Sequence, residues 1–266
     1  ERALKPGKGY YIMPYPSMLM AFRVNPEKSG MHIALAHTDS PSFVIKPRPE
    51  MPDKPYMRIN VEPYGGMLMR TWFDRPLGAA GKVVLKNSQD IFSPEEVLFD
   101  SEAAWFIIPC LAPHLDRETE NNPIDVQKAI VPVYDISGDP EYGLMDKIAE
   151  KLNVDKDDIL AYDLNLYNME KADYIGISKN MLSAPRIDNI ASVAALTEGL
   201  IKAKGEGAGL TLMAAFNNEE TGSRSKQGAD SEMLKMTIEH IYRLMKREDR
   251  LTEDLTGSFM ISADGA

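Results

Sequence analysis

Cysteine, histidine and basic charge are all scarce in this sequence, which also has no long apolar run. Its 266 residues include one cysteine and four histidines, and 30 basic residues face 40 acidic ones, giving a net charge of −10. A single cysteine excludes a disulfide framework and suits a reducing compartment, so we predict a cytoplasmic protein. We expect Cys110 itself to be a small core residue and not a nucleophile.

The same features argue against membranes and nucleic acids as partners. No apolar stretch approaches the roughly 18 residues that a membrane-spanning helix needs. Sequence-independent binding to nucleic acid requires a basic surface, and this chain is acidic. The chain begins at Glu1 and stops at ISADGA without a closing helix. We therefore expect a fragment that lacks both termini.

The two ends of the chain share one pattern. Residues 16–24, 32–37 and 209–216 form short apolar runs typical of strands. Helical spacing follows Pro185 in DNIASVAALTEGLIKAK and returns in SEMLKMTIEHIYRLMKRE, which precedes the apolar run SFMIS. Alternating helices and strands predict an α/β domain whose sheet is covered by helices.

The middle of the chain has a different pattern. Six prolines between residues 41 and 66 exclude a helix and predict irregular chain between edge strands. MLMRTWF, GKVVLK and AIVPVYDI then resemble short strands, and EYGLMDKIAEKLN resembles a helix. We predict a discontinuous α/β domain, residues 1–43 and 182–266, interrupted by a β-rich insert, residues 44–181.

Metal-binding side chains follow the predicted strands. In open α/β sheets, ligands gather at the carboxyl ends of strands. The candidates at such ends, or just before a helix, are His37, Asp39, Asp188, Glu219, Glu220 and Asp264. Each also has an ordinary interpretation: a surface histidine with a capping aspartate for the first two, a helix N-cap for Asp188, a solvated turn for the glutamates and a turn for Asp264.

The adjacent glutamates favour a metal. Two neighbouring carboxylates raise each other's pKa, and a cation relieves that conflict. One glutamate can then bind the metal while the other takes a proton from the attacking water and passes it to the leaving amine. Residues two apart on an extended chain face the same side, so Asp39 can accept the ring N–H of His37 while the other ring nitrogen binds metal. Histidine and carboxylates without thiolates suit zinc, with cobalt or manganese as substitutes.

Five motifs together resemble the M18 aspartyl aminopeptidases. They are AHTDSP (36–41), YGGMLMRTWFDRPLGAAG (64–81), RIDNIAS (186–192), NNEETGSRSKQGA (217–229) and SADGA (262–266). The resemblance implies a three-layer α/β/α zinc-peptidase domain interrupted by a β-rich dimerisation domain. It further implies a dinuclear zinc enzyme that removes an N-terminal Asp or Glu from peptides.

The resemblance also implies a role for each site residue. Asp188 would bridge two zinc ions, His37 and Asp264 would complete one site, and Glu220 would bind the other ion. Glu219 would be the general base, and Asp39 would orient His37. A cis peptide would follow Asp188, and a further histidine ligand would lie downstream of this chain. His240 we place on the side of a helix and not in the site.

Self-association is implied as well. Family members form dodecamers built from dimers, and IIPCLAPHLDRE resembles a stretch whose histidine reaches the neighbouring subunit's active site, which would make His114 a catalytic residue in trans. A surface histidine in a loop is the alternative.

Two alternative functions remain at this point. The first is a broad-specificity dinuclear aminopeptidase acting on neutral N-termini. The second is a non-catalytic assembly or cargo-binding protein that uses the insert as its interface.

Overall fold

The chain folds into two compact units, described here by a computed structural model. Residues 1–40 and 186–266 form the first unit, and residues 41–185 form the second. The predicted insert, residues 44–181, lies within the second unit. The residues that the structure describes are 4–53, 55–112, 114–115, 124–136, 142–204 and 207–265. No helix within these ranges is long and apolar enough to cross a membrane.

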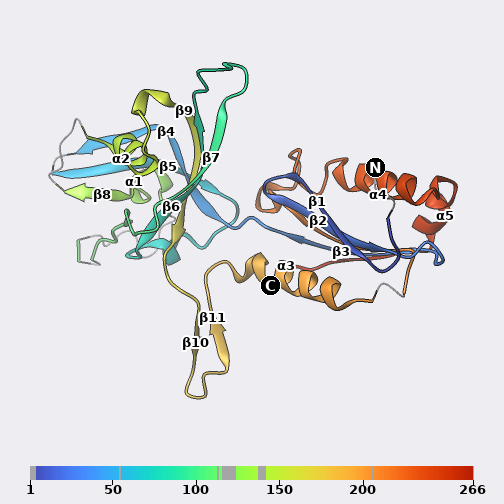
Figure 1. The fold of residues 1–266 in the computed structure, drawn as a ribbon. Coiled ribbons are helices and arrows are strands. Elements are labelled where there is room, and N and C mark those ends of the chain that lie inside the picture. Colours follow the sequence, from blue (N-terminus) through green and yellow to red (C-terminus); the bar gives the residue numbers. More distant parts are fainter. Residues whose placement is uncertain are drawn as a thin grey trace. The chain divides into compact units, whose positions relative to one another are not determined.

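A five-stranded mixed sheet forms the centre of the first unit (Figure 1). Its strand order is β1 (Gly9–Tyr15), β2 (Met18–Val24), β12 (Leu210–Phe216), β3 (Met31–His37) and β13 (Phe259–Ser262). β1, β2 and β12 are joined by antiparallel pairing, whereas β12, β3 and β13 run parallel. Phe216 lies opposite His37, so the parallel strands end at one edge of the sheet.

Two helices contact this sheet. Tyr242 of α4 (Met233–Met245) is fully buried in one cluster with Phe22 and its alternate neighbours on β2. Arg23 points to the opposite face, where its guanidinium donates to the Leu200 and Ile201 carbonyls of α3 (Ile187–Lys202). α5 (Leu251–Thr256) follows α4 and leads into β13. The predicted α/β class is confirmed for this unit.

The second unit is rich in β structure. Its six-stranded sheet has the order β7 (Glu95–Asp100), β6 (Leu77–Leu85), β9 (Ile159–Asn168), β4 (Ser42–Asp53), β5 (Tyr56–Tyr64) and β8 (Val133–Ile136). The other elements are α1 (Val126–Ala129), α2 (Leu144–Leu152) and a separate hairpin of β10 (Asp173–Ile175) and β11 (Met181–Ser183). The helix predicted in EYGLMDKIAEKLN is α2.

The proline-rich stretch is more regular than its sequence predicts. β4 and β5 pair along most of their length, so the expectation of irregular chain was wrong. The register shifts between Ile45 and Glu50, where two prolines lie. β9 pairs with β4 only at Phe43 and Val44. The proline-containing half of β4 therefore needs no ladder hydrogen bonds on that side.

Two smaller expectations also failed in the second unit. MLMRTWF was predicted to be a short strand, but Met69–Trp72 forms a 3-10 turn, in which the Thr71 amide and hydroxyl both donate to the Leu68 carbonyl. The side chains of Met69 and Trp72 still pack against the core, which explains the apolar pattern. Cys110 is exposed and not a core residue, because it follows the last buried position of its stretch, Ile108.

Candidate metal centre

The parallel strands of the first unit bring the predicted ligands together. β3 ends at His37, and the chain beyond β12 and β13 leaves the same edge of the sheet. Asp188 joins them from the start of α3. Two groups have ligand atoms that all lie within 4.8 Å of one another: His37 with Asp188 and Asp264, and His37 with Glu219 and Glu220.

His37 is the centre of both groups and is only 4% exposed. Its Nε2 lies 3.2 Å from Asp188 Oδ1, 3.3 Å from Asp264 Oδ1 and 3.8 Å from Glu219 Oε2. Those three carboxylate side chains are about half exposed, so the cluster faces open space beyond the buried ring. A ligand can therefore reach it from one side.

The backbone fixes the tautomer of His37. Its Nδ1 lies 3.0 Å from the Asp39 carbonyl oxygen, and because a carbonyl only accepts, Nδ1 carries the proton. Burial by itself lowers the pKa of His37, but Asp39, Asp264 and Glu219 together raise it above its ordinary value. The surroundings of Nε2 thus favour a cation, whether a proton or a metal ion.

Asp39 has more contacts than the sequence predicts. Its carboxylate lies 3.3 Å from His37 Nδ1, close to the expected position. The same carboxylate accepts the backbone N–H of Glu219 at 3.1 Å and that of Glu220 at 3.2 Å. One buried side chain therefore supports both the histidine and the turn that carries the two glutamates.

Asp188 lies at a kink near the start of α3. The first residues of this helix follow Arg186, but the regular helical conformation resumes only after Asn189. Asp188 itself has non-helical dihedral angles, and its carboxylate faces His37. The Asp188–Asn189 peptide bond is cis, as the family resemblance implies. The Asp188 carboxylate therefore lies in the cluster around His37.

Asp264 and the glutamates also lie near His37. Asp264 follows β13 in a segment without a turn, and its Oδ1 accepts the Gly265 N–H at 2.8 Å and also contacts His37. Glu219 and Glu220 lie in the 3-10 turn Glu219–Thr221, which begins after Asn218 with φ 60°. Asparagine tolerates this left-handed conformation better than most residues.

The remaining histidines lie outside this cluster. His114 is exposed in a turn of the second unit, whereas the candidate cluster belongs to the first unit. His240 is exposed on α4, as predicted, and His32 is exposed on β3. In the ranges that the structure describes, His37 is the single histidine of the candidate site.

Two further contacts near the cluster were not predicted from the sequence. Ser40 Oγ donates to the Asp188 carbonyl at 3.0 Å, and Asn189 Nδ2 donates to the Ala263 carbonyl at 2.8 Å. Asn189 is fully buried, although in RIDNIAS it resembles any polar residue at a helix start. Both are bonds to backbone atoms far along the chain, for which the local sequence carries no signal.

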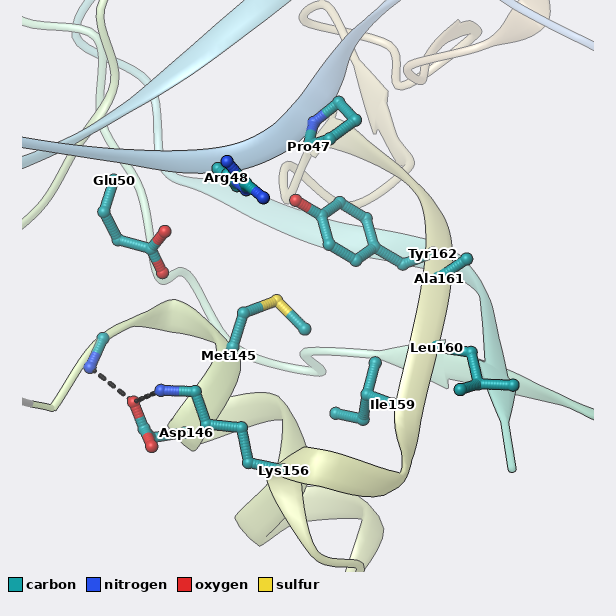
Figure 2. Close-up of a pocket in the computed structure, with 11 residues that line it drawn as sticks. Pro47, Arg48, Glu50, Met145, Asp146, Lys156, Ile159, Leu160, Ala161 and Tyr162 are labelled. Atoms are coloured by element: carbon teal, nitrogen blue, oxygen red, sulfur yellow. Dashed lines mark hydrogen bonds and ion pairs between the residues drawn. The ribbon is translucent and has the colours of Figure 1, made fainter. Parts of the chain in front are cut away.

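A separate cavity of about 560 Å³ lies in the second unit. Figure 2 shows its wall: Arg48, Glu50 and Tyr162 come from β4 and β9, and Asp146 and Lys156 form an ion pair at 2.7 Å on the other side. The Tyr162 hydroxyl donates to the Lys46 carbonyl, and burial raises its pKa to about 12. None of the predicted site residues lines this cavity.

Comparisons with known proteins identify the family of this chain. The family model described as aminopeptidase I zinc metalloprotease (M18) matches residues 1–266. The chain belongs to the M18 family. A probable M18 family aminopeptidase 2 of Clostridium novyi is 40% identical over 99% of this chain. The chain spans 62% of the length of that relative.

Solved structures share the fold. The structure of Chaetomium thermophilum mApe1 matches with a TM-score of 0.86 and 27% identity, covering 98% of this chain and 64% of that one. The S. cerevisiae mApe1 dodecamer matches with a TM-score of 0.77 and 24% identity, covering 98% and 61%. The candidate cluster offers one imidazole nitrogen and several carboxylates, without a thiolate. These donor atoms fit the zinc of this family.

Proposed function

We propose that the protein containing this chain is a zinc-dependent aminopeptidase with a dinuclear centre at the carboxyl edge of the first sheet. The observation that carries the proposal is the convergence of two ligand groups on one buried histidine, His37. Membership of the M18 family supports the same chemistry. We also propose the three-layer arrangement, a cytoplasmic location, and cobalt or manganese as substitute metals.

Each carboxylate has a distinct place in this proposal. Asp188 would bridge two zinc ions, and His37 and Asp264, whose atoms lie 3.3 Å apart, would complete one of the sites. Glu220 would hold the second ion, together with the further histidine that the family resemblance implies. Glu219 is half exposed and lies farther from His37 than either aspartate, at 3.8 Å. This leaves its carboxylate available to act as a base.

The reaction is hydrolysis of the first peptide bond. Bound zinc supplies Lewis-acid polarisation of the scissile carbonyl and of the attacking water. Glu219 Oε2 accepts the proton of that water and returns it to the leaving amine. The Asp39 carboxylate accepts the backbone N–H of Glu219 at 3.1 Å, which positions Glu219 beside the centre. The same carboxylate contacts the ring of His37.

We further propose that the substrates are peptides with an N-terminal Asp or Glu. The test compares chromogenic aspartyl, leucyl and lysyl substrates on the complete protein, with and without a chelator. Rapid release from the aspartyl substrate alone, abolished by the chelator, is the expected result. Activity on the leucyl substrate would instead indicate the broad-specificity aminopeptidase. No activity on any substrate with zinc bound would indicate a non-catalytic assembly or cargo-binding protein.

Assembly through the second unit is also part of the proposal, as dimers that build a dodecamer. His114 is exposed in this unit, as a residue that reaches a neighbouring subunit must be. His114→Ala is expected to lower kcat of the assembled enzyme by about tenfold or more, through loss of a contact to the intermediate. Steady-state kinetics on fractions of verified oligomeric state measure this. An unchanged kcat would exclude the role in trans.

A further inference from the structure

Asn189 is an unusual buried polar residue beside the metal centre. It is 0% exposed, and its Nδ2 donates to the Ala263 carbonyl at 2.8 Å. Its Oδ1 is also buried, yet has no hydrogen-bond partner within the described part of the chain. An unsatisfied buried acceptor costs stability, so the fold alone gives no reason to place an amide here. The hydrogen bond to the Ala263 carbonyl is therefore the feature that can explain the buried amide at this position.

That bond joins two distant segments, each of which carries a ligand. Asn189 follows Asp188 directly, and Ala263 directly precedes Asp264, although the bonded residues are 74 positions apart. Ala263 is itself fixed to the sheet, because its N–H donates to the Leu35 carbonyl at 2.8 Å. The amide of Asn189 therefore connects the start of α3 to a segment that is fixed to β3.

Asp188 is held from two other directions. Ser40 Oγ donates to its carbonyl at 3.0 Å. Gly265 lies so close that a Cβ there would be 3.1 Å from Asp188 Cβ and 3.3 Å from its Cγ. Only a residue without a side chain fits there unless Asp188 moves.

We infer that Asn189 is a positioning residue, whose amide fixes Asp188 and Asp264 at a separation that one zinc ion can bridge. The two carboxylates repel each other when no metal is bound, and hydrogen bonds to the surrounding chain oppose their separation. Such supporting contacts orient metal ligands and commonly change metal affinity by about 10–100-fold when lost. The inference rests on the zinc centre of the proposed function but not on peptidase activity.

The test is the zinc affinity of Asn189→Ala in the complete protein, measured by competition with a chromophoric chelator. Ser101→Ala is the matched control, since Ser101 is also buried and its hydroxyl makes two hydrogen bonds to backbone, but in the second unit. Asn189→Ala is expected to weaken the tighter-bound zinc about 10–100-fold, whereas Ser101→Ala leaves zinc affinity unchanged. Wild-type affinity in Asn189→Ala, or an equal loss in both variants, would overturn the inference.

A second variant keeps the inference testable if Asn189→Ala does not fold. Gly265 is exposed, so Gly265→Ala leaves the core intact while its methyl group displaces Asp188. A weaker affinity for one zinc ion is expected here too, with kcat lowered and KM unchanged. Wild-type zinc affinity in this variant would contradict the inference. A protein that binds zinc as expected but cleaves no peptide would refute the proposed function only.

Discussion

Glu219→Gln is expected to lower kcat by about 10²–10⁴-fold while both zinc ions stay bound. Glutamine keeps the size and hydrogen-bonding shape of the side chain but cannot accept a proton at neutral pH. Glu219 lies 3.8 Å from His37 Nε2, within reach of the centre without being its nearest carboxylate. Steady-state kinetics and zinc content of the same preparation measure the two effects separately.

Glu220→Gln is the matched control, because it makes the same change on the neighbouring residue of the same turn. The Asp39 carboxylate accepts the backbone N–H of both glutamates, so neither substitution removes that support. Glu220→Gln is expected to lower zinc affinity. If Glu219→Gln loses zinc and Glu220→Gln retains it, the two roles are reversed.

Asp188→Asn is expected to abolish activity by emptying the centre. A bridging carboxylate contacts both ions, so its replacement by a neutral amide weakens both sites. Zinc affinity should fall by more than the roughly 100-fold that loss of a merely supporting group costs. Metal analysis after dialysis, together with the rate of peptide hydrolysis, measures the change.

Asp249→Asn makes the same substitution at an exposed position of the short turn Glu248–Arg250. It should leave zinc content and rate at wild-type values. If Asp188→Asn retains two zinc ions per chain, Asp188 is not the bridge, and the helix-start interpretation of this residue would need to be revisited.

The secondary structure of the first unit was largely accessible from its sequence. β3 and β12 are short apolar runs, and α3 and α4 have helical spacing of their apolar residues, so local pattern and final structure agree. The second unit was harder to predict. Pro47 and Pro49 suggest irregular chain, but β4 pairs with the next strand, β5, on both sides of a shift in register that the local pattern does not reveal.

The site was predictable to the level of residue type. A carboxylate or histidine after each parallel strand is a local signal, and the sheet explains why His37 meets Asp264. The supporting contacts gave no such signal. Asn189 bonds a backbone carbonyl 74 residues away, and Asp39 accepts amide protons from residues 180 and 181 positions distant. Such pairs form only when the sheet is assembled.

Anomalous scattering at the zinc edge, from crystals of the complete protein, tests the central claim most directly. Two zinc peaks are expected, one beside His37 and Asp264 and the other beside Glu220, with Asp188 between them and Glu219 bound to neither. No peak at this cluster, or one peak with Glu219 as its ligand, would contradict the account.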